Sequence, residues 1–242
     1  MKIHRFALIA LTSCACWAAS PARAGAEPLS SVEITALRHP AAWPYSDFLA
    51  GLDEFEERQS LAPQAKLEFR LRPDRPDAAL GDTVVKLETE ARDYTLELGD
   101  GKFSLPRLPR DEQEHARISL NQQRHDFTFH MPRAEVRTAG LPDDTLRLGD
   151  LRLACAVNMA IFKKSIGMLR SLGLTVLARR GDWCRVEKNG GQSADAPFNF
   201  RVMTMEAGTR RERQTFDQPS RQVRLPLERA GWPDDTLIRL EP

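Results

Sequence analysis

Two near-identical octapeptides carry adjacent pairs of carboxylates. AGLPDDTL occupies residues 139–146 and AGWPDDTL occupies residues 230–237, and they differ only at the third letter. The pairs are Asp143-Asp144 in the first copy and Asp234-Asp235 in the second. Two carboxylates can act as the acid and the base or nucleophile of a glycoside hydrolase. One hypothesis is therefore a hydrolase of envelope glycan or peptide, with His130 as a further candidate.

The residues around each doublet favour a second hypothesis, in which the phrase is architecture. The residue before a proline is driven into extended backbone. Proline fixes φ at the first central position of a type I turn, and aspartate suits the position after it. Threonine and leucine then open a strand, on which adjacent side chains point to opposite faces. The two carboxylates of a doublet are therefore expected to diverge at a turn that leads into a strand.

The similarity between the two copies extends upstream of the phrase. Residues 129–132 (FHMP) and 223–226 (VRLP) both end an alternating run at a proline, and a short polar link containing Glu135 or Glu228 follows each. The recurrence of strand, proline, link, turn and strand predicts a duplicated sheet edge or two related domains.

Three histidines, His115, His125 and His130, suggest a metal site. If residues 126–130 form a strand, His125 and His130 project from opposite faces and cannot meet one ion. Asp126 and His130 share a face but lie about 13 Å apart at the rise of a strand. We therefore expect surface or sheet-edge histidines and predict no metal ligands.

The motifs of common enzyme and cofactor sites are missing from the sequence. It contains no Gly-x-Ser-x-Gly elbow, no His-Glu-x-x-His, no P-loop and no dinucleotide-binding glycine pattern. A catalytic triad assembles in space, so this lowers the expectation of an enzyme without excluding one. We predict no catalytic residues and no cofactor.

Two tryptophans stand beside prolines. Trp43-Pro44-Tyr45 and Trp232-Pro233 can offer flat aromatic surfaces on which sugars or peptides stack. The alternative is that each tryptophan packs at the edge of a domain.

The N-terminus has the layout of a secretory signal peptide. Lys2 and Arg5 form a positive n-region, residues 6–20 are uncharged and mostly apolar, and Ala22 and Ala24 supply the small residues that a signal peptidase reads. The uncharged run is shorter than the roughly 20 residues of a transmembrane helix. We expect cleavage after Ala24, a periplasmic or secreted protein, and no transmembrane segment in the mature chain.

An alternative is a lipoprotein signal. Residues 11–14 (LTSC) are similar to a lipid-attachment box. In that case Cys14 becomes the mature N-terminus of a lipid-anchored assembly factor, although the apolar stretch before it is short.

Loss of the signal peptide leaves 32 basic and 34 acidic residues, a net charge of about −2. The basic residues are scattered, and their longest cluster is RRER at residues 210–213. The sequence therefore predicts no nucleic-acid partner.

The cysteines of the mature chain predict a disulfide. Cys14 and Cys16 leave with the signal peptide, whereas Cys155 and Cys184 remain. Two cysteines in an oxidising compartment are typical of a bridge, worth roughly 3 kcal/mol for a loop of about 30 residues. Two separate free thiols are the alternative, and the spacing is unlike the Cys-x-x-Cys of redox sites.

Apolar periodicity predicts two helices. The first covers residues 45–63, with Ser46 or Asp47 as its cap and Pro63 at its end. The second covers residues 157–173 and is ended by Gly173. The apolar faces are Tyr45, Phe48, Leu52 and Phe55 in the first helix and Phe162, Ile166, Leu169 and Leu172 in the second.

The other segments alternate between apolar and polar residues, which predicts short antiparallel strands. A hairpin turn is predicted at Gly99–Gly101. The alternating positions are Leu67-Phe69-Leu71, Val85-Leu87, Tyr94-Leu96-Leu98, Phe103-Leu105, Ile118-Leu120, Phe127-Phe129-Met131 and Leu151-Leu153-Cys155, followed after the second helix by LTVLAR, WCRVEK, FNFRVMTM, RQTF and QVRLPL.

We therefore predict a mainly β (α+β) fold of antiparallel β-sandwich-like halves, each with one packed helix. Residues 1–24 are the signal peptide, residues 25–150 the first domain, and residues 151–242 the second β-rich half. The disulfide would tie the strand before the second helix to the strand after it.

Three blocks of the sequence resemble a family of uncharacterised secreted bacterial proteins. They are residues 53–73 (DEFEERQSLAPQAKLEFRLRP), 145–155 (TLRLGDLRLAC) and 225–241 (LPLERAGWPDDTLIRLE), with GDGKFSLPR at 99–107 between them. The resemblance implies no catalytic residues, and it implies that Cys155 pairs with Cys184. Residues 100–109 are also similar to a strand turn of transthyretin-like or carboxypeptidase-regulatory-like sandwiches.

These features predict a non-enzymatic binding or envelope-interaction module. Its expected partner is a protein or a cell-wall glycan.

Overall fold

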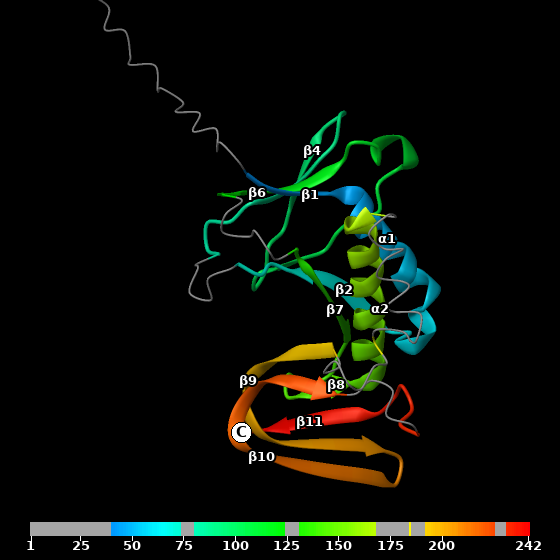
Figure 1. The fold of residues 1–242 in the computed structure, drawn as a ribbon, viewed down its shortest axis with the longest axis vertical. Coiled ribbons are helices and arrows are strands. Elements are labelled where there is room, and N and C mark those ends of the chain that lie inside the picture. Colours follow the sequence, from blue (N-terminus) through cyan, green and yellow to red (C-terminus); the bar gives the residue numbers. More distant parts are fainter. Residues whose placement is uncertain (1–39, 74–79, 124–130, 168–183, 185–191, 226–230) are drawn as a thin grey trace, which may run out of the picture. The chain divides into compact units, whose positions relative to one another are not determined.

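The computed structural model describes residues 40–73, 80–123, 131–167, 184, 192–225 and 231–242 (Figure 1). In chain order the elements are β1 (Pro40–Pro44), α1 (Tyr45–Glu57), the 3-10 turn η1 (Gln59–Leu61), β2 (Ala65–Arg70), β3 (Val85–Glu88), β4 (Asp93–Leu96), β5 (Lys102–Phe103), η2 (Arg110–Glu112), β6 (Arg117–Gln123), β7 (Arg133–Thr138), β8 (Thr145–Arg147), α2 (Leu148–Ser165), β9 (Gln192–Ala207), β10 (Arg210–Leu225) and β11 (Leu237–Glu241). Neither described helix is long and apolar enough to cross a membrane.

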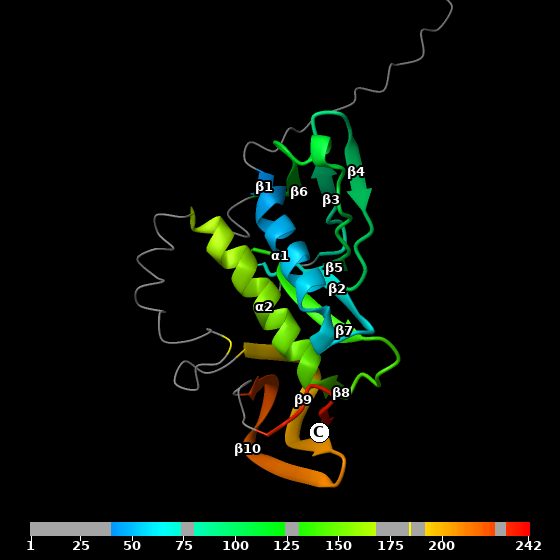
Figure 2. The ribbon, with the colours of Figure 1, turned by 90° about the vertical axis from the view of Figure 1, so that its right-hand side faces the viewer.

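The described strands form three sheets with the orders β1-β6-β3-β4, β5-β2-β7 and β10-β9-β11-β8. Every paired strand runs antiparallel to its neighbour. The predicted mainly β fold with antiparallel sheets and two helices is confirmed. The helices pack against each other (Figure 2). They approach closely at Gly51, where a Cβ atom would lie 2.7 Å from the side chain of Ile161.

Helix α1 matches its predicted face but not its predicted cap. It begins at Tyr45 with Pro44 at the N-cap position and no side-chain hydrogen bond there. Ser46 and Asp47 lie inside the first turn, so the prediction that one of them caps the helix is wrong. The predicted apolar residues, Tyr45, Phe48, Leu52 and Phe55, all contribute to the core.

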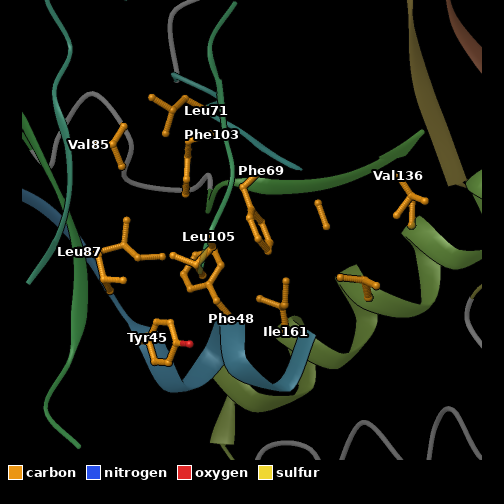
Figure 3. Close-up of a cluster of buried hydrophobic side chains, with 14 of the residues drawn as sticks. Tyr45, Phe48, Phe69, Leu71, Val85, Leu87, Phe103, Leu105, Val136 and Ile161 are labelled. Carbon is orange, nitrogen blue, oxygen red and sulfur yellow. The ribbon is translucent and has the colours of Figure 1, made fainter. Parts of the chain in front are cut away.

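The first core lies between the two helices and the strands of the first two sheets (Figure 3). The ring of Phe69 has its centroid 5.3 Å from that of Phe48 in an edge-to-face contact and 5.8 Å from that of Phe103. Aromatic pairs at these separations stabilise beyond the area that they bury. The three rings therefore join α1, β2 and β5.

Helix α2 buries two faces in two different cores. Leu153, Val157 and Ile161 pack in the first core, whereas Leu148, Leu151 and Cys155 pack in the second core with β9 and β11. Because both faces are buried, Leu151, Leu153 and Cys155 imitate the period-two pattern of a strand. The strand predicted there is wrong, and α2 runs without a break across the domain boundary predicted between residues 150 and 151.

The predicted apolar face of the second helix is also wrong at Phe162. Helix α2 ends at Ser165, and Phe162 is 43% exposed. Leu169 and Leu172 lie outside the described residues, as do Phe127, Phe129 and the run LTVLAR. The run WCRVEK also lies outside them, except for Cys184.

The predicted turn at Gly99–Gly101 is confirmed, but its strands pair elsewhere. Gly99 and Lys102 exchange two backbone hydrogen bonds of 2.9 Å. Asp100 (φ 57°) and Gly101 (φ 73°) between them are left-handed, as a type I′ turn requires. Beyond this bridge β4 pairs with β3 and β5 pairs with β2, so the turn passes the chain from one sheet to another.

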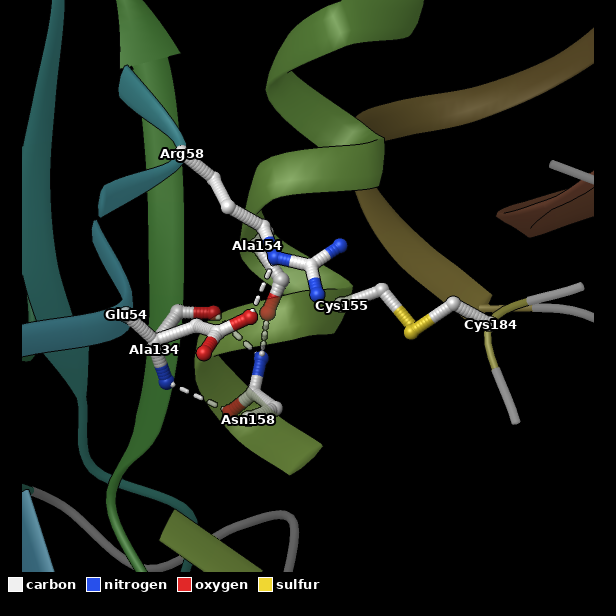
Figure 4. The surroundings of a disulfide bond; sticks show 7 residues. All are labelled: Glu54, Arg58, Ala134, Ala154, Cys155, Asn158 and Cys184. Carbon is white, nitrogen blue, oxygen red and sulfur yellow. Dashed lines mark hydrogen bonds and ion pairs between the residues drawn. A yellow bond between two sulfur atoms is a disulfide. The ribbon is translucent and has the colours of Figure 1, made fainter. Parts of the chain in front are cut away.

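Cys155 and Cys184 form a disulfide with their Cα atoms 5.8 Å apart (Figure 4). It joins α2, rather than the strand expected before the helix, to the segment that precedes β9. One turn further along α2, Asn158 accepts from Ala134 N–H (2.9 Å) and donates to Ala134 O (2.9 Å). This side chain therefore satisfies the backbone of the edge strand β7, which would otherwise carry unpaired polar groups.

Backbone carbonyls from a distant segment hold the first turn of α2. Leu148 N–H donates to Thr236 O (2.9 Å), and Gly149 N–H donates to Asp234 O (2.8 Å). A helix cannot satisfy these N–H groups internally. The second PDDT segment therefore caps α2 in place of a side chain. Gly149 is required for the approach, because a Cβ atom would overlap Leu61 O and lie 2.8 Å from Asp234 O.

Gly149→Ala is expected to destabilise the protein by about 3 kcal/mol or more, because backbone on two sides must shift and overpacking commonly costs about 1–3 kcal/mol. Urea unfolding followed by circular dichroism measures the change. Gly81→Ala is the control, since no atom of the described residues lies within 4 Å of its Cβ position, and a change within about 0.5 kcal/mol is expected. Helix propensity alone predicts a gain of about 1 kcal/mol for Gly149→Ala; observing that gain would refute the close approach.

Candidate functional site

The two PDDT segments form the same turn. Thr145 N–H donates to Pro142 O (3.0 Å), and Thr236 N–H donates to Pro233 O (3.1 Å). Proline is therefore the first residue of each turn, whereas the sequence predicted it at the second position. The glycines at equivalent places, Gly140 and Gly231, have φ of 79° and 86°. The interpretation of the repeat as a turn into a strand agrees with this geometry.

The strands that follow the two turns pair with each other. Leu146 lies opposite Ile238, and Arg147 lies opposite Leu237. In the repeat, Leu146 corresponds to Leu237, and Arg147 corresponds to Ile238. Replacing each residue by its counterpart therefore turns one pair into the other, so the two strands are related by a local two-fold axis. Antiparallel pairing places the two turns at opposite ends of this ladder, so the doublets are roughly 15 Å apart at strand rise.

The individual carboxylates have separate surroundings. The side chain of Asp143 is 96% exposed and lies 3.8 Å from Arg137. Asp144 accepts from the hydroxyl of Thr145 (2.9 Å). Asp234 pairs with Arg152, which also bonds Trp232 O (3.1 Å). The doublets therefore do not converge as a hydrolase pair requires.

A buried carboxylate that sequence reasoning missed lies beside the first turn. Asp150 accepts from both the N–H and the hydroxyl of Thr138 (2.7 Å each), and Arg147 lies 3.8 Å away. Burial raises the pKa of Asp150 above its ordinary 3.8, and the Thr138 hydrogen bonds and the two nearby arginines offset this only in part. Asp150 thus ties the end of β7 to the start of α2.

The raised pKa of Asp150 predicts a pH dependence of stability. Because the folded-state pKa lies above the unfolded value, the protein should gain stability as pH falls through the folded pKa towards the unfolded value of about 3.8, with no further gain below it. Asp150→Asn keeps both contacts, because its oxygen accepts from Thr138 N–H and its nitrogen donates to the hydroxyl, and it lacks this gain. Asp150→Ala should lose about 1–3 kcal/mol at neutral pH.

Chemical unfolding of the three proteins at about pH 4 and pH 7 measures these differences. Lowering the pH should raise the free energy of unfolding of wild type relative to that of Asp150→Asn. A difference that is equal at both pH values, or an asparagine variant as unstable as the alanine variant, contradicts the assignment.

The described residues hold no group of three or more His, Cys, Asp and Glu side chains placed to ligate a metal. His125 and His130 lie outside the described residues. His115 is described, and its side chain is 68% exposed.

The two Trp-Pro motifs have different surroundings. Trp232 is buried in the second core, with the guanidinium of Arg210 4.0 Å from its ring centroid. It therefore packs as a core residue and offers no open stacking surface. Trp43 packs against the first core with part of its side chain and also lines a surface groove.

This groove is the candidate functional site. It has a volume of about 460 Å³ and lies where β1 ends, α1 begins and residues 113–117 run alongside. Its lining residues are Ala42, Trp43, Pro44, Ser46, Gln113, Glu114, His115, Ala116 and Arg117. Binding sites for small molecules are typically about 300–1,000 Å³ and combine apolar walls with a few polar groups. We name this site the Trp43 groove.

Tyr45 anchors the far wall of the Trp43 groove to the core. Its buried hydroxyl donates to Pro106 O (3.1 Å) and accepts from Leu108 N–H (3.0 Å). Burial raises the pKa of Tyr45, an effect that the Leu108 hydrogen bond partly offsets. Gln113 donates to Leu108 O (2.9 Å), and Tyr45 N–H donates to Ala116 O (2.9 Å). The groove is therefore built on fixed backbone.

Charges at the rim of the Trp43 groove are balanced. Arg117 contacts Glu88 (2.6 Å), and Ser119 donates to the same carboxylate. Partial burial raises the pKa of Glu88, but the Ser119 and Arg117 hydrogen bonds outweigh it and hold that pKa below its ordinary value. His115 lies 3.8 Å from Glu114 and 4.0 Å from Glu90.

Sequence reasoning found Trp43 but missed the opposite wall. Gln113 and Arg117 carry no motif, and His115 is weighed only as a metal ligand. Only β1–β6 pairing brings these residues to the tryptophan, through the pairs Trp43 with Ile118 and Pro44 with Arg117.

Comparison with protein-family models, curated proteins and solved structures finds no match to this chain. The family resemblance drawn from the three sequence blocks stays a prediction.

Proposed function

We propose that the chain is an exported, non-catalytic module that binds a component of the bacterial envelope through the Trp43 groove. The observation that carries the proposal is the groove itself, in which an aromatic side chain and several hydrogen-bonding groups stand on anchored backbone. The signal-like N-terminus and the cysteine pair support export. The wide separation of the two aspartate doublets favours binding over hydrolysis.

Retention on isolated bacterial envelopes tests the function. The purified mature chain should co-sediment with envelopes, and Trp43→Ala should reduce the retained fraction several-fold because it removes the aromatic wall. Thr95→Ala on β4 is the matched control, since Thr95 is exposed and does not line the groove. Wild-type protein that is not retained, or a Trp43→Ala variant retained as well as wild type, contradicts the proposal.

The form of export has its own test. Mass spectrometry of the protein recovered from cells should give Gly25 as the N-terminal residue, as cleavage after Ala24 requires. A lipid-modified Cys14 would show instead that the chain is an anchored lipoprotein.

A further inference from the structure

We infer that the ligand of the Trp43 groove is an uncharged glycan chain, an inference that rests on the proposed function and names the ligand class. The face of a sugar ring that carries C–H groups packs on an aromatic ring, while its hydroxyls need both donors and acceptors at the rim. The Trp43 groove supplies both kinds of contact. Trp43 forms the aromatic wall, and Ser46, Gln113 and Glu114 line the same space.

Charge in the groove favours a neutral ligand. The guanidinium of Arg117 is already paired with Glu88 at 2.6 Å, so it is not available as an unpaired cation for a phosphate or an acidic peptide. His115 stands between two carboxylates, Glu90 and Glu114. Among the described lining residues, neither sign of charge dominates, which is unlike a site built for an ion.

The neighbouring edge strand disfavours a peptide added as an extra strand. β1 is the edge of its sheet, yet two of its residues, Pro40 and Pro44, have no backbone N–H. Strand addition draws its affinity from such main-chain groups. A polyproline ligand usually docks between several aromatic rings, whereas Trp43 is the only Trp, Tyr or Phe in the described lining.

The backbone of the opposite wall supports a shaped site. His115 has φ of 64°, a left-handed conformation that is uncommon for residues other than glycine. Its side chain is 68% exposed. Unusual backbone of this kind concentrates at ligand-binding positions, and here it places His115 on the rim of the groove.

Titration of the mature chain with two neutral oligosaccharides, chitotetraose and cellotetraose, tests the inference by chemical-shift perturbation. At least one should bind and shift the amides of residues 113–117. Trp43→Ala should weaken binding at least about tenfold, the equivalent of about 1.4 kcal/mol. Trp43→Phe should retain most of the affinity because it keeps an aromatic wall, and Thr95→Ala should be unchanged.

Ser46→Tyr gives an independent check, because it fills the groove from α1 without removing core atoms, and it should weaken binding as Trp43→Ala does. A charged control, tetragalacturonate, and a proline-rich peptide complete the panel. Binding of either control in preference to both neutral sugars overturns the inference. If no neutral sugar binds while envelope retention still depends on Trp43, the glycan inference fails and the proposed function stands. If that dependence is also absent, both fail.

Discussion

The close approach at Gly149 is the constraint on which the arrangement of the chain depends. At this one residue the backbone of η1 and the second PDDT turn both reach the start of α2, and a single Cβ atom would displace them. Asp150, the next residue, holds the end of β7. One helical turn thus gathers three distant segments, and α2 can then bury one face in each of two cores.

The two copies of the PDDT segment have different structural roles at this junction. Each copy makes the same turn and opens a strand, and the two strands pair about a local two-fold relation. The relation breaks where the first copy leads directly into α2, whereas the second copy offers the carbonyls of Asp234 and Thr236 to that helix. A symmetric unit used twice therefore yields an asymmetric pair: one copy starts a helix and the other caps it.

Local patterns were enough to predict α1, most of the described strands and the Asp100-Gly101 turn, because each depends on residues adjacent in sequence. The sequence misassigned Leu151–Cys155 because a helix buried on two sides loses its amphipathic period. It missed the Trp43 groove for a different reason. Pairing of β1 with β6 brings Gln113 and Arg117 to Trp43, and no periodicity encodes which strands become neighbours.

The Trp43 groove is linked to the core through one side chain. Tyr45 is buried among the aromatic residues of the first core, yet its hydroxyl fixes the chain at Pro106 and Leu108. Leu108 in turn accepts from Gln113, which lines the groove. Because a buried phenol needs a partner for its hydroxyl, core packing and wall position are not independent. A site organised in this way is shaped before its ligand arrives, which reduces the ordering cost of binding.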